Sequence, residues 1–74
     1  MSVATIVNQW DPYSLFPYAP SDEYSGEINK ITDFMKRDYD QTDLILELKR
    51  IFDESDIVED KRDFSTIAEK LITA

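Results

Sequence analysis

The stretch DYDQT, at residues 38–42, has the DxDxT spacing of enzymes that transfer phosphate through an aspartate. That chemistry needs the first aspartate at the tip of a buried strand in a large α/β domain, whereas Asp38 follows a predicted helix. We therefore interpret the match as coincidental. Among the sixteen carboxylates no pair stands out for acid–base chemistry, and the chain is predicted not to be an enzyme.

The same carboxylates do not fit a calcium-binding loop. Counted from Asp38, Asp43 stands where an EF-hand needs glycine, and Lys49 stands where it needs the bidentate glutamate. The segment that starts at Asp53 fails similarly, with Ile57 at a ligand position. A weak carboxylate site for Ca²⁺ or Mg²⁺ stays open as an alternative. A solvated acidic loop is the preferred interpretation, and neither a metal nor a cofactor is predicted.

Two residue types that carry much of protein chemistry are missing. The 74 residues include no cysteine and no histidine, which removes thiolate ligands, disulfides and the commonest general base. A single glycine leaves no Gly-rich phosphate loop. The absence of cysteine is typical of a reducing compartment, and we expect the protein in the cytoplasm.

The net charge indicates the class of partner. Sixteen acidic residues against eight lysines and arginines give a net charge of −8. Nucleic acids and anionic membranes attract basic proteins, so neither is expected to bind this chain directly. No apolar run approaches the roughly 18 residues of a membrane span, and no signal peptide is predicted. The expected partner is another protein with a basic surface.

The acidic residues form two groups, one over residues 38–47 and one over 53–60. We predict that they dock on a basic, nucleic-acid-handling site of another protein and occlude it, as an inhibitor or immunity protein would. The simpler interpretation is a solubilising face. The predicted binding residues are Asp38, Asp40, Asp43, Glu47, Asp53, Glu54, Asp56, Glu59 and Asp60.

Apolar residues recur at helical spacing, which predicts an all-α fold. We expect one domain over residues 1–74, with four short helices in a small irregular bundle. The predicted helices cover residues 3–10, 22–37, 42–54 and 64–72. The predicted caps are Ser2, Ser21, Thr42 or Asp40, and Asp63.

Two details of this scheme concern single residues. Gly26 lies inside the second predicted helix, where it costs up to about 1 kcal/mol relative to alanine. We interpret it as a position that lets a neighbouring backbone or ring approach closely. Between the third and fourth helices we predict a loop, with Ile57 and Val58 turned inward as anchors.

The segment NQWDPYSLFPYAP, residues 8–20, holds all three prolines and four of the nine aromatic residues. We expect its Pro- and aromatic-rich part to form a loop packed over the core between the first two helices. Trp10, Leu15 and Phe16 are predicted to belong to the core.

The hydroxyls of Tyr13 and Tyr18 are predicted to stay in water. These two tyrosines support an alternative function. In it, the protein is a structural or regulatory adaptor, or a homodimer, that recognises its partner through the aromatic loop 13–18.

A longer pattern, WDPxxLxPxAPxDEYxxEI, runs over residues 10–28. It resembles the signature of the YugE-like family of small bacterial proteins, a domain of unknown function, and covers about 19 of the 74 residues. The closing IAEKL, residues 67–71, is similar to the last helix of that family. The resemblance implies an all-α fold of about four helices, in bacteria or their phages and mobile elements, and implies no activity. Ser14 stands where the family pattern has glycine, which implies a different turn there.

Overall fold

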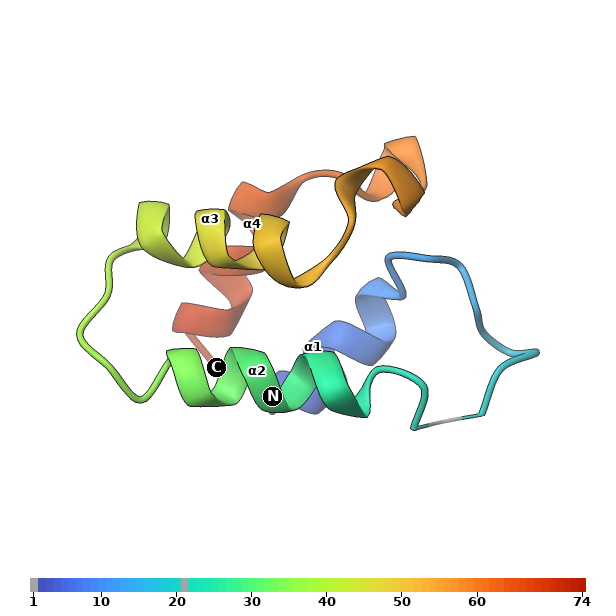
Figure 1. Cartoon of the computed structure of the whole chain (residues 1–74), viewed down its shortest axis with the longest axis horizontal. Coiled ribbons are helices and arrows are strands. Elements are labelled where there is room, and N and C mark those ends of the chain that lie inside the picture. Colours follow the sequence, from blue (N-terminus) through green and yellow to red (C-terminus); the bar gives the residue numbers. More distant parts are fainter. Residues whose placement is uncertain (1, 21) are drawn as a thin grey trace.

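The computed structural model describes residues 2–20 and 22–74, and within them the predicted all-α class is confirmed. The α-helices are α1 (Val3–Trp10), α2 (Ser25–Phe34), α3 (Gln41–Ile51) and α4 (Phe64–Ile72). Two 3-10 helices, η1 (Glu54–Asp56) and η2 (Glu59–Lys61), follow α3. Helices α2 and α3 run in opposite directions along the long axis (Figure 1). Helix α1 packs against α2 and α4, and α3 packs against the same two helices.

Helix α1 has the bounds that its apolar spacing predicts. The Ser2 hydroxyl accepts a hydrogen bond from the Thr5 amide at 3.1 Å and thereby satisfies a free donor of the first turn. The helix ends at Asp11, which adopts a left-handed conformation with φ of 45° directly before Pro12. Because a residue before proline avoids helical geometry, Pro12 ensures that the helix stops there.

Helices α2 and α3 are shorter than predicted. Residues 22–24 form a turn closed by i to i+3 bonds such as Ser25 N to Asp22 O, so α2 starts at Ser25. At its end, Lys36 and Arg37 donate to carbonyls three residues back, which tightens the last turn and stops the helix. The predicted cap Ser21 lies outside the described residues.

Helix α3 begins at the second of its two predicted caps. The Asp40 carboxylate accepts from the Asp43 amide at 2.8 Å, and the Asp43 carboxylate accepts from the Asp40 amide at 3.3 Å. This capping box satisfies two free donors. At the other end Phe52 is extended and buried, so the chain leaves the helix before Asp53 rather than continuing to residue 54.

The core lies between the four helices and includes one buried aromatic residue from each helix or its end. The Trp10 ring meets Phe52 and Phe64 edge-on, with ring centroids 5.2 and 5.8 Å apart. Tyr24 is buried and packs edge-on against Phe52. The buried apolar residues are Ile6, Val7, Trp10, Tyr24, Ile31, Leu44, Leu48, Phe52, Ile57, Phe64, Ile67, Ala68 and Leu71.

Two apolar residues that adjoin buried ones along the chain are exposed. Ile57 is buried as predicted, but its neighbour Val58 is 39% exposed, which corrects the prediction for Val58. Ile72 is 42% exposed, since it lies about 100° around α4 from the buried Leu71 and falls outside the buried arc.

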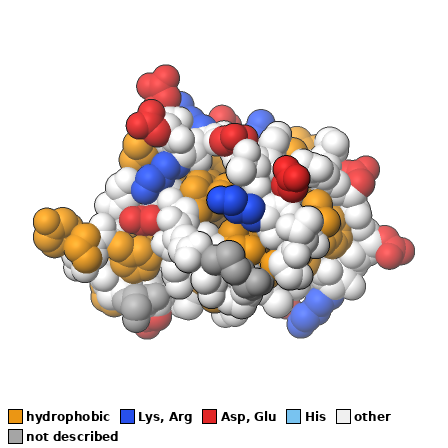
Figure 2. All heavy atoms as spheres, turned by 180° about the vertical axis from the view of Figure 1, so that it is seen from behind, with side chains coloured by type: hydrophobic (Ala, Val, Ile, Leu, Met, Phe, Trp, Pro, Cys, Tyr) orange, Lys and Arg blue, Asp and Glu red, His pale blue; other side chains and the backbone are white. Residues whose placement is uncertain are grey.

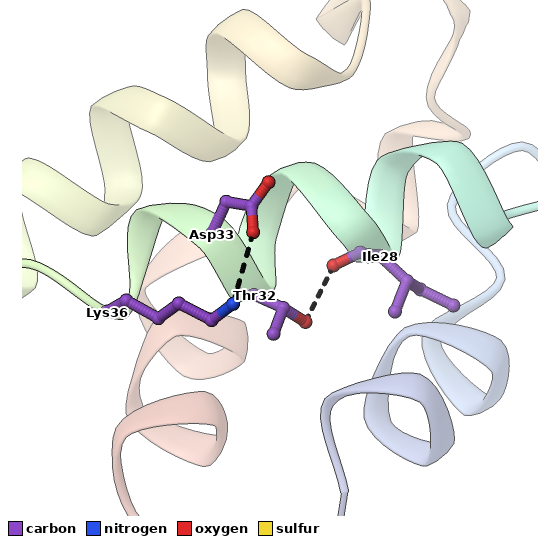
Figure 3. A network of polar contacts seen from close by, with 4 residues as sticks. All are labelled: Ile28, Thr32, Asp33 and Lys36. Atoms are coloured by element: carbon purple, nitrogen blue, oxygen red, sulfur yellow. Dashed lines mark hydrogen bonds and ion pairs between the residues drawn. The ribbon is translucent and has the colours of Figure 1, made fainter.

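Polar contacts on α2 are local, as Figure 3 shows. The Thr32 hydroxyl donates to the Ile28 carbonyl at 2.8 Å, and Lys36 pairs with Asp33 at 3.5 Å. Both charged side chains are about three-quarters exposed, so the pair adds little to stability.

The space around Gly26 corrects the interpretation of that residue. A methyl group at this position would meet no atom within 4 Å, so no neighbouring group approaches it closely. Gly26→Ala is therefore expected to raise the free energy of unfolding by about 0.5–1 kcal/mol, because alanine loses less backbone entropy in a helix. Thermal unfolding measures this as a rise in Tm of roughly 2–8 °C. An unchanged or lower Tm would contradict it.

Candidate protein-binding surface

The carboxylate of Asp11 organises the aromatic loop. Its Oδ1 accepts hydrogen bonds from the Leu15 amide at 2.9 Å and from the Tyr24 hydroxyl at 2.6 Å. Its Oδ2 accepts from the Phe16 amide at 3.2 Å. Burial raises the pKa of this carboxyl, but the bonds from Tyr24, Leu15 and Phe16 outweigh that effect and hold the pKa below its ordinary value. Asp11 thus fixes the path of the loop. Its position before Pro12 indicates that the helix ends there, but it does not indicate these hydrogen bonds.

The half-buried side chain of Tyr13 links the aromatic loop to a distant segment. The hydroxyl accepts a hydrogen bond from the Asp53 amide at 2.9 Å. The ring packs edge-on against Phe52, with centroids 5.8 Å apart, and the residue is half-buried. Tyr13 therefore joins the aromatic loop to the start of η1.

Leu15 and Phe16 lie at the edge of the core. Both are half-buried and pack against it, and the Phe16 ring meets Tyr24 edge-on at 5.6 Å. Between them and Tyr13, Ser14 has a φ of 53°. A left-handed backbone favours glycine over residues that carry a side chain.

Residues 10–12, which lead from α1 into the aromatic loop, are bonded at several points to the segment that holds η1 and η2. The Trp10 indole N–H donates to the Lys61 carbonyl at 2.8 Å, and the Lys61 ammonium donates to the Asp11 carbonyl at 2.9 Å. The Val58 amide donates to the Pro12 carbonyl at 3.2 Å. These contacts join residues more than forty positions apart and place both segments at one end of the molecule (Figure 1).

We call residues 53–62 the acidic segment. Ile57 is buried and anchors it, while Glu54, Asp56, Glu59 and Asp60 are exposed. The two cations that follow donate to backbone carbonyls rather than to these acids, since Lys61 bonds Asp11 and the Arg62 Nε bonds Ile57 at 3.0 Å. The segment therefore exposes these four carboxylates, while Lys61 is half-buried and Arg62 is itself exposed.

The remaining predicted acidic residues are mostly engaged in local structure. Asp40 and Asp43 form the capping box of α3, and Glu47 pairs with Arg50 at 3.2 Å. The Asp53 carboxylate accepts from the Ser55 hydroxyl and amide, which lowers its pKa. Asp38 is exposed, but it lies before α3, at the opposite end of that helix from the acidic segment.

The two acidic groups begin at opposite ends of α3. The helix has 11 residues, so its ends beside Asp40 and Asp53 are about 16 Å apart along its axis, roughly twice the Debye length in physiological salt, and Glu47 lies between them. In Figure 2 red side chains stand at the corner over η1 and η2, and an orange projection lies below them at the tip of the aromatic loop. Blue side chains lie beside the red ones at this corner, and both signs of charge are also interspersed over the rest of that face.

Tyr18 is exposed as predicted, and to an unusual degree. Its exposed fraction is 96%, the largest among the exposed large apolar residues, which are Tyr18, Leu46, Val58 and Ile72. It stands between Pro17 and Pro20 in a turn closed by the Ala19 amide and the Leu15 carbonyl at 2.9 Å.

A groove of about 350 Å³ lies between α1 and α4. Its lining residues are Ile6, Gln9, Trp10, Ile67, Lys70, Thr73 and Ala74. Its three large apolar residues are buried, so a ligand would find little apolar surface to cover. Among residues 2–20 and 22–74 no group of three or more carboxylates could hold a metal ion.

No described helix is long and apolar enough to cross a membrane. Comparisons with protein-family models, curated proteins and solved structures found no match to this chain. The resemblance of residues 10–28 to the YugE-like family therefore stays a prediction.

Proposed function

We propose that the protein is a binding module of the inhibitor or immunity type, which covers a basic, nucleic-acid-handling surface on another protein. The observation that carries this proposal is the acidic segment, whose Glu54, Asp56, Glu59 and Asp60 carboxylates face solvent while Lys61 and Arg62 donate to backbone carbonyls. In a chain of net charge −8, this end attracts basic proteins and repels nucleic acid.

The segment is suited to binding because it is held in place before a partner arrives. Buried Ile57, the Val58 amide bond to Pro12 and the Lys61 ammonium bond to Asp11 fix its course. Little entropy is then lost on association. Complementary charge of this kind chiefly speeds association and selects partners.

The test compares two triple variants with the same change of net charge. Glu54→Gln, Asp56→Asn and Glu59→Gln remove charge from the acidic segment. Asp53 is left intact because its carboxylate holds η1. The control removes three exposed acids of other elements, through Asp33→Asn, Asp38→Asn and Glu69→Gln.

Immobilised wild-type protein and both variants are incubated with lysate from the source cells at low ionic strength. The expected result is a set of basic proteins that wild type and control retain and that the acidic-segment variant retains at least about tenfold less. These proteins should be released as the salt approaches about 1 M, where the Debye length is about 3 Å. Equal retention by all three forms would contradict the proposal.

A further inference from the structure

We propose that Tyr18 is an anchor residue that enters an apolar pocket on the same basic protein that the acidic segment binds. The inference rests on the proposed function and extends it, since it makes the aromatic loop and the acidic segment two parts of one interface rather than two alternatives.

The first step is the availability of the side chain. Tyrosine and tryptophan dominate binding energies at interfaces because one rigid ring buries about 150–250 Å². Tyr18 is 96% exposed, so nearly all of this area is free to be covered by a partner. No hydrogen bond from the described residues ties up its hydroxyl, which can reach a polar group at the rim of a pocket.

The second step is the rigidity of the loop beneath it. The Asp11 carboxylate holds the Leu15 and Phe16 amides, and the Ala19 amide closes the turn on Leu15. Pro17 and Pro20 restrict the backbone on both sides of Tyr18. A side chain presented in this way loses little conformational freedom on binding.

The third step is the chemistry of the partner. Hydrogen bonds from the Val58 amide to Pro12 and from the Asp53 amide to Tyr13 place the acidic segment beside the start of the aromatic loop. Figure 2 shows the loop tip and the acidic corner exposed on the same side of the molecule. A partner that covers Tyr18 must therefore tolerate nearby carboxylates, which favours an apolar pocket with a rim of lysine and arginine.

The first experiment places the photo-reactive residue p-benzoylphenylalanine, one position at a time, at Tyr18, at Glu59 and at Leu46. Leu46 is the control, because it is exposed, apolar and located on α3. In the source cells, positions 18 and 59 should cross-link to the same basic protein, and position 46 should not. Cross-links from 59 alone, or to different proteins from 18 and 59, would overturn the single interface.

The second experiment repeats the lysate capture with Tyr18→Ala and the matched control Leu46→Ala. Tyr18→Ala should reduce retention of that basic protein by about 30-fold, as for other hot-spot residues, and leave Tm unchanged. Leu46→Ala should bind like wild type. If Tyr18→Ala binds normally while the acidic-segment variant does not, the inference fails and the proposed function stands. If both bind normally, both fail.

Discussion

Trp10→Ala is expected to lower the free energy of unfolding by about 3–5 kcal/mol, as for other truncations of a large buried aromatic residue. The substitution removes two edge-on ring contacts, with Phe52 and Phe64, and the indole bond to the Lys61 carbonyl. A domain of this length has roughly 4–11 kcal/mol of stability in total, so the substitution removes a large fraction of it.

Urea unfolding followed by far-ultraviolet circular dichroism measures this loss, since the chain has no other tryptophan for fluorescence. Two controls separate the effect of the buried ring from the effect of its N–H donor and from that of truncating any aromatic residue. Trp10→Phe keeps a buried ring but removes the N–H donor, and it should lose less. Tyr18→Ala truncates an exposed aromatic residue and should change stability by less than about 0.5 kcal/mol. A Trp10→Ala variant as stable as Tyr18→Ala would contradict the assigned core.

Asp11→Asn is expected to lower the free energy of unfolding at pH 7 by about 2–3 kcal/mol. The asparagine side chain has one acceptor oxygen, whereas the carboxylate has two. In one orientation its NH₂ group would face the Phe16 amide, and in the other it would face the Leu15 amide and the Tyr24 hydroxyl. Two donors would then meet, and at least one loses its partner. Asp38→Asn removes the same charge from an exposed residue and serves as the control.

The effect of Asp11→Asn should also depend on pH. The folded state lowers the pKa of this carboxyl, so the folded protein binds its proton less readily than the unfolded chain. The contribution of Asp11 is therefore complete above the unfolded pKa of about 3.9 and is lost as the pH falls through the lower folded pKa. The difference between wild type and Asp11→Asn should be equal at pH 7 and 5 and smaller near pH 3. A constant difference down to pH 3 would contradict the assigned hydrogen bonds.

Helix positions were predictable where one apolar stripe and one cap coincide. The spacing of Val3, Ile6, Val7 and Trp10 after Ser2 predicts α1 with its observed bounds, and Asp63 caps α4 through the Thr66 amide as expected. The start of α2 and the end of α3 were not predictable, because Tyr24 and Phe52 are buried in the core by contacts with distant residues.

The candidate site was likewise predictable from the sequence only in part. Composition alone shows a strongly acidic protein, and the acids at 53–60 are visible in the sequence. The sequence does not show the local hydrogen bonds that the carboxylates of Asp40, Asp43 and Asp53 accept. Tyr13 and Tyr18 are similar in sequence context, yet one contacts Asp53 and the other faces water.

What the sequence by itself determined is the helical class, the acidic character and the presence of a stiff aromatic loop, because each depends on spacing or composition within a short stretch. Only the tertiary structure decided that this loop and the acidic segment share one end of the molecule. The bonds between Trp10 and Lys61 and between Asp11 and Lys61 join residues about fifty positions apart. No local pattern encodes such a pairing, since it depends on how four helices close around one core.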